Sequence, residues 1–212
     1  MRVVLGLVLV VAVVAVGAEL VVPPRIEETI EARVAAEVPE ATSVRADVDS
    51  FPVVARGLAT GKVQRLAVSL RGVGLPSVAV ESVDVEALGI EIERRALLDG
   101  EVDLRRIDAG RLRAVVTEEA LEDALPGDVV DLTLSPGRVE ATVAGQTVGT
   151  DVEVSGGRVR FDLGPLPEVS VALPGPSFFP CTLEGEVTDG AVRLGCVLER
   201  VPEYLLRRLE GS

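Results

Sequence analysis

Apolar and polar residues follow two different periods along this chain. In the stretch Pro24–Val38, apolar residues recur every four positions, and charged residues fill most of the positions between them. This spacing predicts an amphipathic α-helix with one apolar stripe. Pro24 suits a first helical position, and Pro39 ends the helix because proline cannot continue the hydrogen-bond pattern. The stripe consists of Ile26, Ile30, Val34 and Val38.

Beyond Pro39, apolar residues alternate with polar ones over most of the chain. A period of two predicts β-strands with one apolar face each. The alternation slips by one position between Val80 and Val83, which predicts a β-bulge near Glu81. The apolar members of these first strands are Val44, Ala46, Val48, Leu66, Val68, Leu70, Val78, Val80, Val83, Val85, Leu88, Ile90 and Ile92.

Shorter strands with tight turns fill the second half of the chain. Thr117 is placed to cap a short helix over Glu118–Leu125, because a threonine side chain accepts a hydrogen bond from the first helical turn. Asp189-Gly190 predicts a two-residue hairpin turn that pairs Val187 with Val192. The predicted fold class is therefore α+β and mostly β, with a long antiparallel sheet and one amphipathic helix near the N-terminus.

The predicted sheet is too wide for the helix to cover. Eight strands about 4.8 Å apart span roughly 38 Å, whereas a helix is about 10 Å wide. Apolar faces of that size are rarely left bare in soluble monomers. The sheet is therefore expected to curl around the helix, to close on itself, or to leave a groove for an apolar ligand.

The first 22 residues predict export from the cytoplasm. Arg2 precedes the apolar run Val3–Ala18, and Val16-Gly17-Ala18 offers small residues for cleavage. The run favours a signal peptide, but Leu20–Val22 extends it and leaves an uncleaved anchor in the cytoplasmic membrane open. The expected organisation is residues 1–22 as signal peptide or anchor, and residues 23–212 as a single extracytoplasmic domain.

Composition narrows the classes of function. Apolar residues make up 48% of the chain but aromatic residues only 2%, so any apolar site is aliphatic and suits acyl chains. The net charge of −13 argues against nucleic acid, which requires a basic face. Histidine is absent, and no phosphate-binding loop, nucleophile elbow or zinc-protease motif occurs. We therefore expect no enzyme activity, no cofactor and no metal site.

The two cysteines, Cys181 and Cys196, flank the predicted hairpin at Asp189-Gly190. They fall on one face of that hairpin, offset diagonally by two residues, so an irregularity near Pro180 is needed to bring them into bonding range. Cysteines of exported proteins usually pair, which favours a disulfide. The alternative is two small buried side chains in a reducing compartment.

The residues also carry a family resemblance, which extends over roughly Arg25–Leu198. The helix PRIEETIEARV and the following Val44–Val73 resemble the LmeA-like phospholipid-binding proteins of actinobacterial cell envelopes. Ser50-Phe51-Pro52 matches the corner of that pattern. Leu97–Val102 and Val116–Leu121 are similar to its later strand and short helix. The cysteine pair and the compact second half depart from it.

The resemblance implies a curved sheet wrapped on the helix, similar to the tubular lipid-binding domains of bactericidal/permeability-increasing proteins. It also implies phospholipid binding and a part in envelope lipid or lipoglycan maintenance, without catalysis. A scaffold that binds protein partners through an edge strand is the alternative. The candidate lipid-binding residues are Ile26, Ile30, Val34, Val38, Phe51, Leu66, Val68, Leu70, Val83, Val85, Ile90 and Ile92.

Overall fold

The structure is a computed structural model of the 212-residue chain. It describes residues 24, 27–49, 60–75, 78–93, 104–125, 129–136, 138–143, 145–155, 158–162, 169–172, 181 and 183–199. The predicted export segment, Ile26 and Phe51 lie outside these residues. No helix within the described ranges is both long and apolar enough to cross a membrane.

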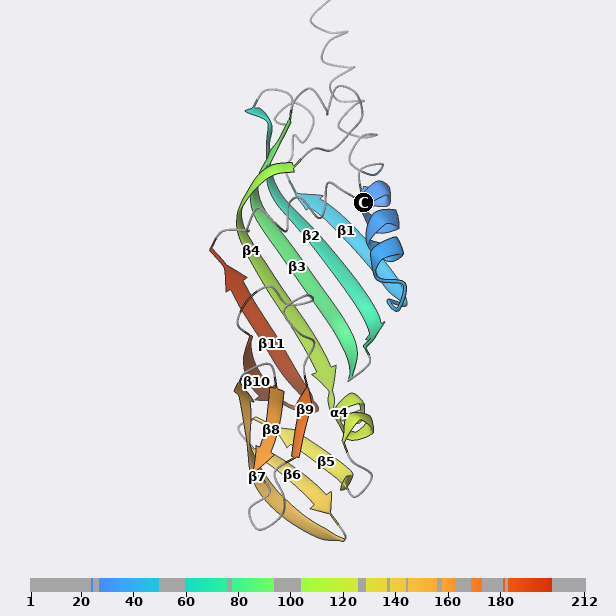
Figure 1. The fold of residues 1–212 in the computed structure, drawn as a ribbon, viewed down its shortest axis with the longest axis vertical. Helices are drawn as coiled ribbons and strands as arrows, with labels where there is room; N and C mark the ends of the chain where they lie inside the picture. The colour runs from blue at the N-terminus through green and yellow to red at the C-terminus, as the bar shows by residue number, and fades with distance from the viewer. Residues whose placement is uncertain are drawn as a thin grey trace, which may run out of the picture.

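A six-stranded antiparallel sheet forms the larger part of the molecule (Figure 1). Its strands follow the order β1-β2-β3-β4-β11-β10, so the last hairpin of the chain completes a sheet begun by the first four strands. The strand bounds are β1 Ser43–Asp49, β2 Lys62–Gly74, β3 Ala79–Ile92, β4 Leu104–Thr117, β10 Glu184–Thr188 and β11 Ala191–Leu198. The N-terminal helix (residues 27–37) lies beside β1 at one edge of this sheet.

A second, five-stranded sheet in the order β5-β6-β7-β8-β9 lies below the first in Figure 1. The sequence predicts a single sheet, because alternation does not reveal which strands pair. The strands of this second sheet are β5 Val129–Ser135, β6 Arg138–Val143, β7 Gln146–Ser155, β8 Arg158–Asp162 and β9 Val169–Ala172. The mostly-β, antiparallel fold class is confirmed.

Helix α4 (Glu118–Ala124) connects the two sheets and contacts both β4 and β5. The Thr117 hydroxyl accepts a hydrogen bond from the amide of Ala120 at 3.3 Å, the cap that the sequence predicts. The hairpin turn at Gly190 also lies at this junction. The Gly190 carbonyl accepts from the amide of Glu118, and the Gly190 amide donates to Leu134 of β5, each at 3.0 Å.

The predicted hairpin at Asp189-Gly190 is confirmed, with Val187 paired to Val192. Gly190 has φ +66°, a left-handed conformation that glycine adopts without the strain of a side chain. β10 begins only at Glu184, so regular pairing stops before Cys181 is reached.

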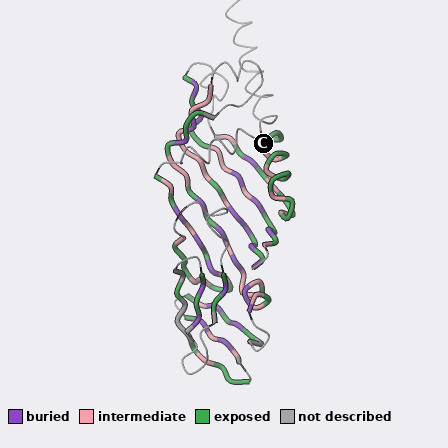
Figure 2. The backbone as a smooth tube through the Cα atoms, in the orientation of Figure 1, coloured by how far each residue is buried: buried purple, intermediate pink, exposed green. Residues whose placement is uncertain are grey.

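Buried residues form one continuous hydrophobic core that runs from the larger sheet through α4 into the smaller sheet. Figure 2 shows buried and more exposed positions alternating along the strands, as a period of two requires. Leu121 of α4 and Leu132 of β5 are fully buried in this main core. A separate small cluster of Val63, Ile90 and Ile107 lies in the same large sheet.

The predicted bulge near Glu81 is wrong. Pairing between β2 and β3 runs from Arg71↔Ser82 to Val73↔Val80 with no inserted residue. Gly72 of the neighbouring strand β2, which lies opposite Glu81 in this register, has φ +57°. The left-handed residue reorients the strand, so that Leu70 and Val73 both reach the core although they are three positions apart.

Candidate lipid-binding face

Strand register places apolar side chains in rows across the larger sheet. Antiparallel partners project to the same side, so the register identifies the residues that share a face. Three successive rows each cross five strands, β1, β2, β3, β4 and β11. They are Val44, Leu70, Val83, Ala114 and Leu194; Ala46, Val68, Val85, Leu112 and Cys196; and Val48, Leu66, Ala87, Gly110 and Leu198. Five strands at about 4.8 Å spacing make this apolar face roughly 19 Å wide.

Coverage of the apolar face falls from the first row to the third. Val83 in the first row is 2% exposed, whereas Val85, two residues further along β3, is 36% exposed. Every member of the third row is only half-buried. We call Val48, Leu66, Val85, Ala87 and Leu198 the apolar window, because they form an incompletely covered patch beside the mostly buried first row.

The predicted stripe of the N-terminal helix faces the protein. Ile30, Val34 and Val38 are half-buried and pack against the main core. The same helix holds the edge of β1 through Glu31, whose carboxylate accepts a hydrogen bond from the backbone amide of Ala46 at 2.8 Å. The helix therefore borders the apolar window on the β1 side (Figure 1).

The predicted site residues do not all lie in one group on the apolar face. Leu66, Val68, Leu70, Val83 and Val85 share the apolar face, as their pairing requires. Ile90 is 2% exposed in the small cluster with Val63 and Ile107, and Ile92 packs against that cluster.

The small cluster lies beyond Gly89, which has φ +63° and changes the side-chain alternation of β3. Val48, Leu66 and Ala87 of the apolar window also touch this cluster, which closes one end of the window.

The site residues predicted from the sequence do not include the members of the apolar face on β4 and β11. Leu112 and Ala114 alternate with Arg111 and Arg113, and Leu194 follows Arg193, so the alternation was visible in the sequence. The sequence does not reveal that β4 pairs with β11, because the strands of the whole smaller sheet lie between them along the chain. That pairing extends the apolar face from β4 to β11.

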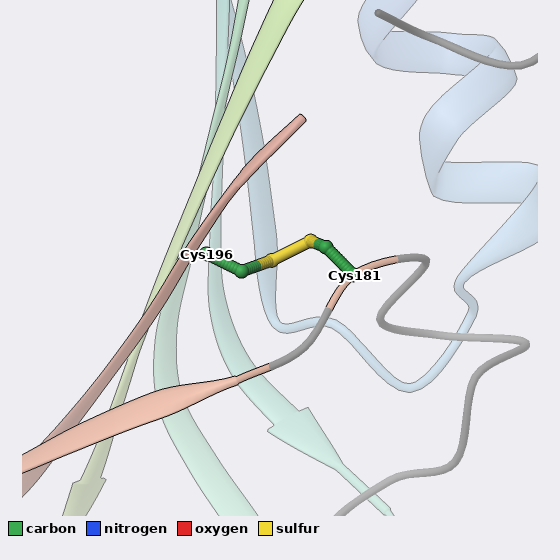
Figure 3. Close-up of a disulfide and its surroundings, with 2 residues drawn as sticks. All are labelled: Cys181 and Cys196. Atoms are coloured by element: carbon green, nitrogen blue, oxygen red, sulfur yellow. A yellow bond between two sulfur atoms is a disulfide. The ribbon is translucent and has the colours of Figure 1, made fainter. Parts of the chain in front are cut away.

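A disulfide joins Cys181 to Cys196, with the two Cα atoms 5.9 Å apart. Figure 3 shows it reaching from β11 to the segment that leads into β10. Cys196 belongs to the middle row of the apolar face, and Cys181 and Leu183 pack against the main core. The bond therefore fixes this segment against the apolar face.

The opposite face of the larger sheet is charged. The Arg65 Nε and Arg111 Nη1 atoms contact the two oxygens of Glu86 at 2.6 and 3.1 Å. A hollow of about 530 Å³ on this face is lined by five charged residues, Asp84, Arg113, Glu184, Glu186 and Arg193, together with Ala114, Val115, Gly185, Leu194 and Gly195. Its lining does not suit an acyl chain. Among the described residues, no group of cysteine and acidic side chains could hold a metal ion.

An incompletely covered apolar face is a feature of interaction sites, ligand-binding grooves among them. The chain belongs to the LmeA-like phospholipid-binding family, whose model matches residues 13–203. No curated protein and no solved structure matches the chain.

Proposed function

We propose that this protein binds a phospholipid outside the cytoplasm. An acyl chain contacts the apolar window, and the head group remains in solvent. The observation that carries the proposal is the 36% exposure of Val85 in the middle row of the apolar face, where the other four members of that row are 9% exposed or less. Membership of a phospholipid-binding family supports the same ligand. Each methylene removed from water contributes about 0.8 kcal/mol to binding, so an aliphatic patch is sufficient to hold a chain.

The protein acts without catalysis in the maintenance of envelope lipid or lipoglycan. The opposite sheet face supports a non-enzymatic role, because its carboxylates pair with arginines as on a solvated surface. Glu86 faces Arg65 and Arg111, and Glu91 faces Lys62 at 3.0 Å. The disulfide supports an oxidising location, where such bonds persist.

A scaffold that pairs its edge strands with protein partners is less favoured. Two of the four outer strands of the described sheets, β1 and β5, each have two edge amides bonded to glutamates of an adjacent helix. Such covering prevents strand addition at those edges.

Mass spectrometry of an organic extract of the purified full chain tests the proposal. We expect phospholipid in near-stoichiometric amount, and a reporter fused after Ser212 active only outside the cytoplasm. Protein free of lipid after mild purification, and unable to take phospholipid from vesicles, would overturn the lipid assignment. A reporter active in the cytoplasm would overturn the location.

A further inference from the structure

The N-terminal helix holds the free edge of β1 through two carboxylates. Glu31 Oε1 accepts a hydrogen bond from the amide of Ala46 at 2.8 Å, and Glu27 Oε1 accepts from the amide of Val48 at 3.1 Å. Glutamates four residues apart are about 6 Å apart along a helix, and amides two residues apart are about 6.8 Å apart along a strand. The two spacings match, so one helix face satisfies two edge amides.

Helix α4 holds the edge of β5 in the same way. Glu122 Oε1 accepts from the amide of Leu132, and Glu118 Oε2 accepts from the amide of Leu134, each at 2.6 Å. In both cases the two glutamates are four residues apart, and the helix runs antiparallel to the strand that follows it. The molecule therefore uses one arrangement twice, once at an edge of each sheet.

The two helices differ in what else holds them. Leu121 of α4 has no exposed surface, and Leu125 at its end is 9% exposed. The described residues of the apolar stripe, Ile30 and Val34 in the N-terminal helix and Val38 just after it, are only half-buried. Burial of a leucine side chain contributes far more than a partly exposed contact. Removal of the two glutamate bonds should therefore release the N-terminal helix but not α4.

We propose that the N-terminal helix is a lid on the β1 side of the apolar window, with Glu27 and Glu31 as its latch. This inference rests on the proposed lipid binding. When the two bonds break, the lid lifts and uncovers Val48 and the edge of β1, so an acyl chain enters sideways between helix and strand. When they reform, the half-buried stripe of the helix covers the chain.

Hydrogen–deuterium exchange of the full-length wild-type protein tests the movement itself. The amides of Ala46 and Val48 and those of Leu132 and Leu134 have the same kind of glutamate acceptor, so the pairs are matched. We expect the first pair to exchange at least about tenfold faster, because opening of the lid costs less free energy than release of α4. Equal or slower exchange of Ala46 and Val48 would overturn the lid.

Transfer of a fluorescent phospholipid from phosphatidylcholine–phosphatidylglycerol vesicles to the protein tests the gate. Glu27→Ala with Glu31→Ala should speed transfer about tenfold, the effect of losing hydrogen bonds to charged acceptors. Glu27→Gln with Glu31→Gln keeps the carbonyl acceptors and should return the rate close to that of the wild type. Glu118→Ala with Glu122→Ala should leave the rate of lipid transfer unchanged, although the amides of Leu132 and Leu134 should exchange faster.

The outcomes separate the lid from the proposed function. If the wild type takes up lipid but the Glu27/Glu31 alanine variant transfers it at the same rate, the lid is overturned and lipid binding stands. The lid is also overturned if both alanine pairs speed transfer equally. If the wild type takes up no lipid, the proposed function fails, and the amide exchange of Ala46 and Val48 alone decides whether the helix lifts.

Discussion

Val85 and Leu112 are direct partners across β3 and β4, yet Val85 is 36% exposed and Leu112 only 8%. Both side chains lie in the same row, on the same face of the sheet. The difference in cover therefore marks the point at which the protein leaves its own apolar surface open.

Val85→Glu should abolish phospholipid binding and leave the fold intact. A carboxylate in contact with hydrocarbon loses its hydration without gaining a partner, which costs several kcal/mol. Because the side chain is partly exposed, we expect the free energy of unfolding to fall by only about 1 kcal/mol. Vesicle binding and urea denaturation measure the two effects.

Val197→Glu provides the matched control. Val197 is 64% exposed and pairs with Arg111, so it lies on the charged face of the same sheet. This variant should bind lipid like the wild type. Equal loss of binding in the Val85 and Val197 variants would show that added negative charge, rather than the apolar window, governs the interaction with vesicles.

Val34→Phe should reduce lipid occupancy with little change in the melting temperature of the lipid-free protein. Val34 is half-buried on the helix that borders the window, so added bulk occupies ligand space more than packed core. Val83→Phe is the contrast, because Val83 is 2% exposed and overpacking there costs about 1–3 kcal/mol. Differential scanning calorimetry distinguishes them. A large drop in melting temperature for Val34→Phe would mean that the stripe is ordinary core.

Cys181→Ser should lower the free energy of unfolding by about 3 kcal/mol, because a cross-link between residues 15 apart restricts the unfolded chain. Urea denaturation of the variant and of the reduced wild type should give the same midpoint. Thiol labelling of denatured, unreduced wild type should find no free cysteine. Two reactive thiols in that experiment would contradict the disulfide.

Gly89→Ala should lower the free energy of unfolding by about 1–2 kcal/mol, the cost of a side chain in left-handed backbone. Gly89 has φ +63°, and an added Cβ would collide with the carboxylate of Asp108. Gly74→Ala is the control, because a Cβ at Gly74 meets nothing within 4 Å. Thermal denaturation of both variants measures the difference. An unchanged melting temperature of the Gly89→Ala variant would show that this position of β3 does not require glycine.

The sequence by itself determined the local elements and the composition of the site. Alternation with a period of two reflects the geometry of a single strand, so Leu66, Val68 and Leu70 were correctly placed on one face without any knowledge of their partners. The cap at Thr117 and the turn at Asp189-Gly190 also depend on neighbouring residues alone. The scarcity of aromatic residues fixed an aliphatic lining, whatever the fold.

Only the tertiary structure decided which strands pair and which apolar side chains stay uncovered. The pairing of β4 with β11 joins segments far apart in the sequence, so no local pattern could divide the strands into two sheets. Val83 and Val85 look alike in the sequence, but one is buried and the other partly exposed, because cover depends on what other elements reach them. Likewise Glu27 and Glu31 look like solvated helix residues, and only the position of β1 gives their carboxylates amides to bind.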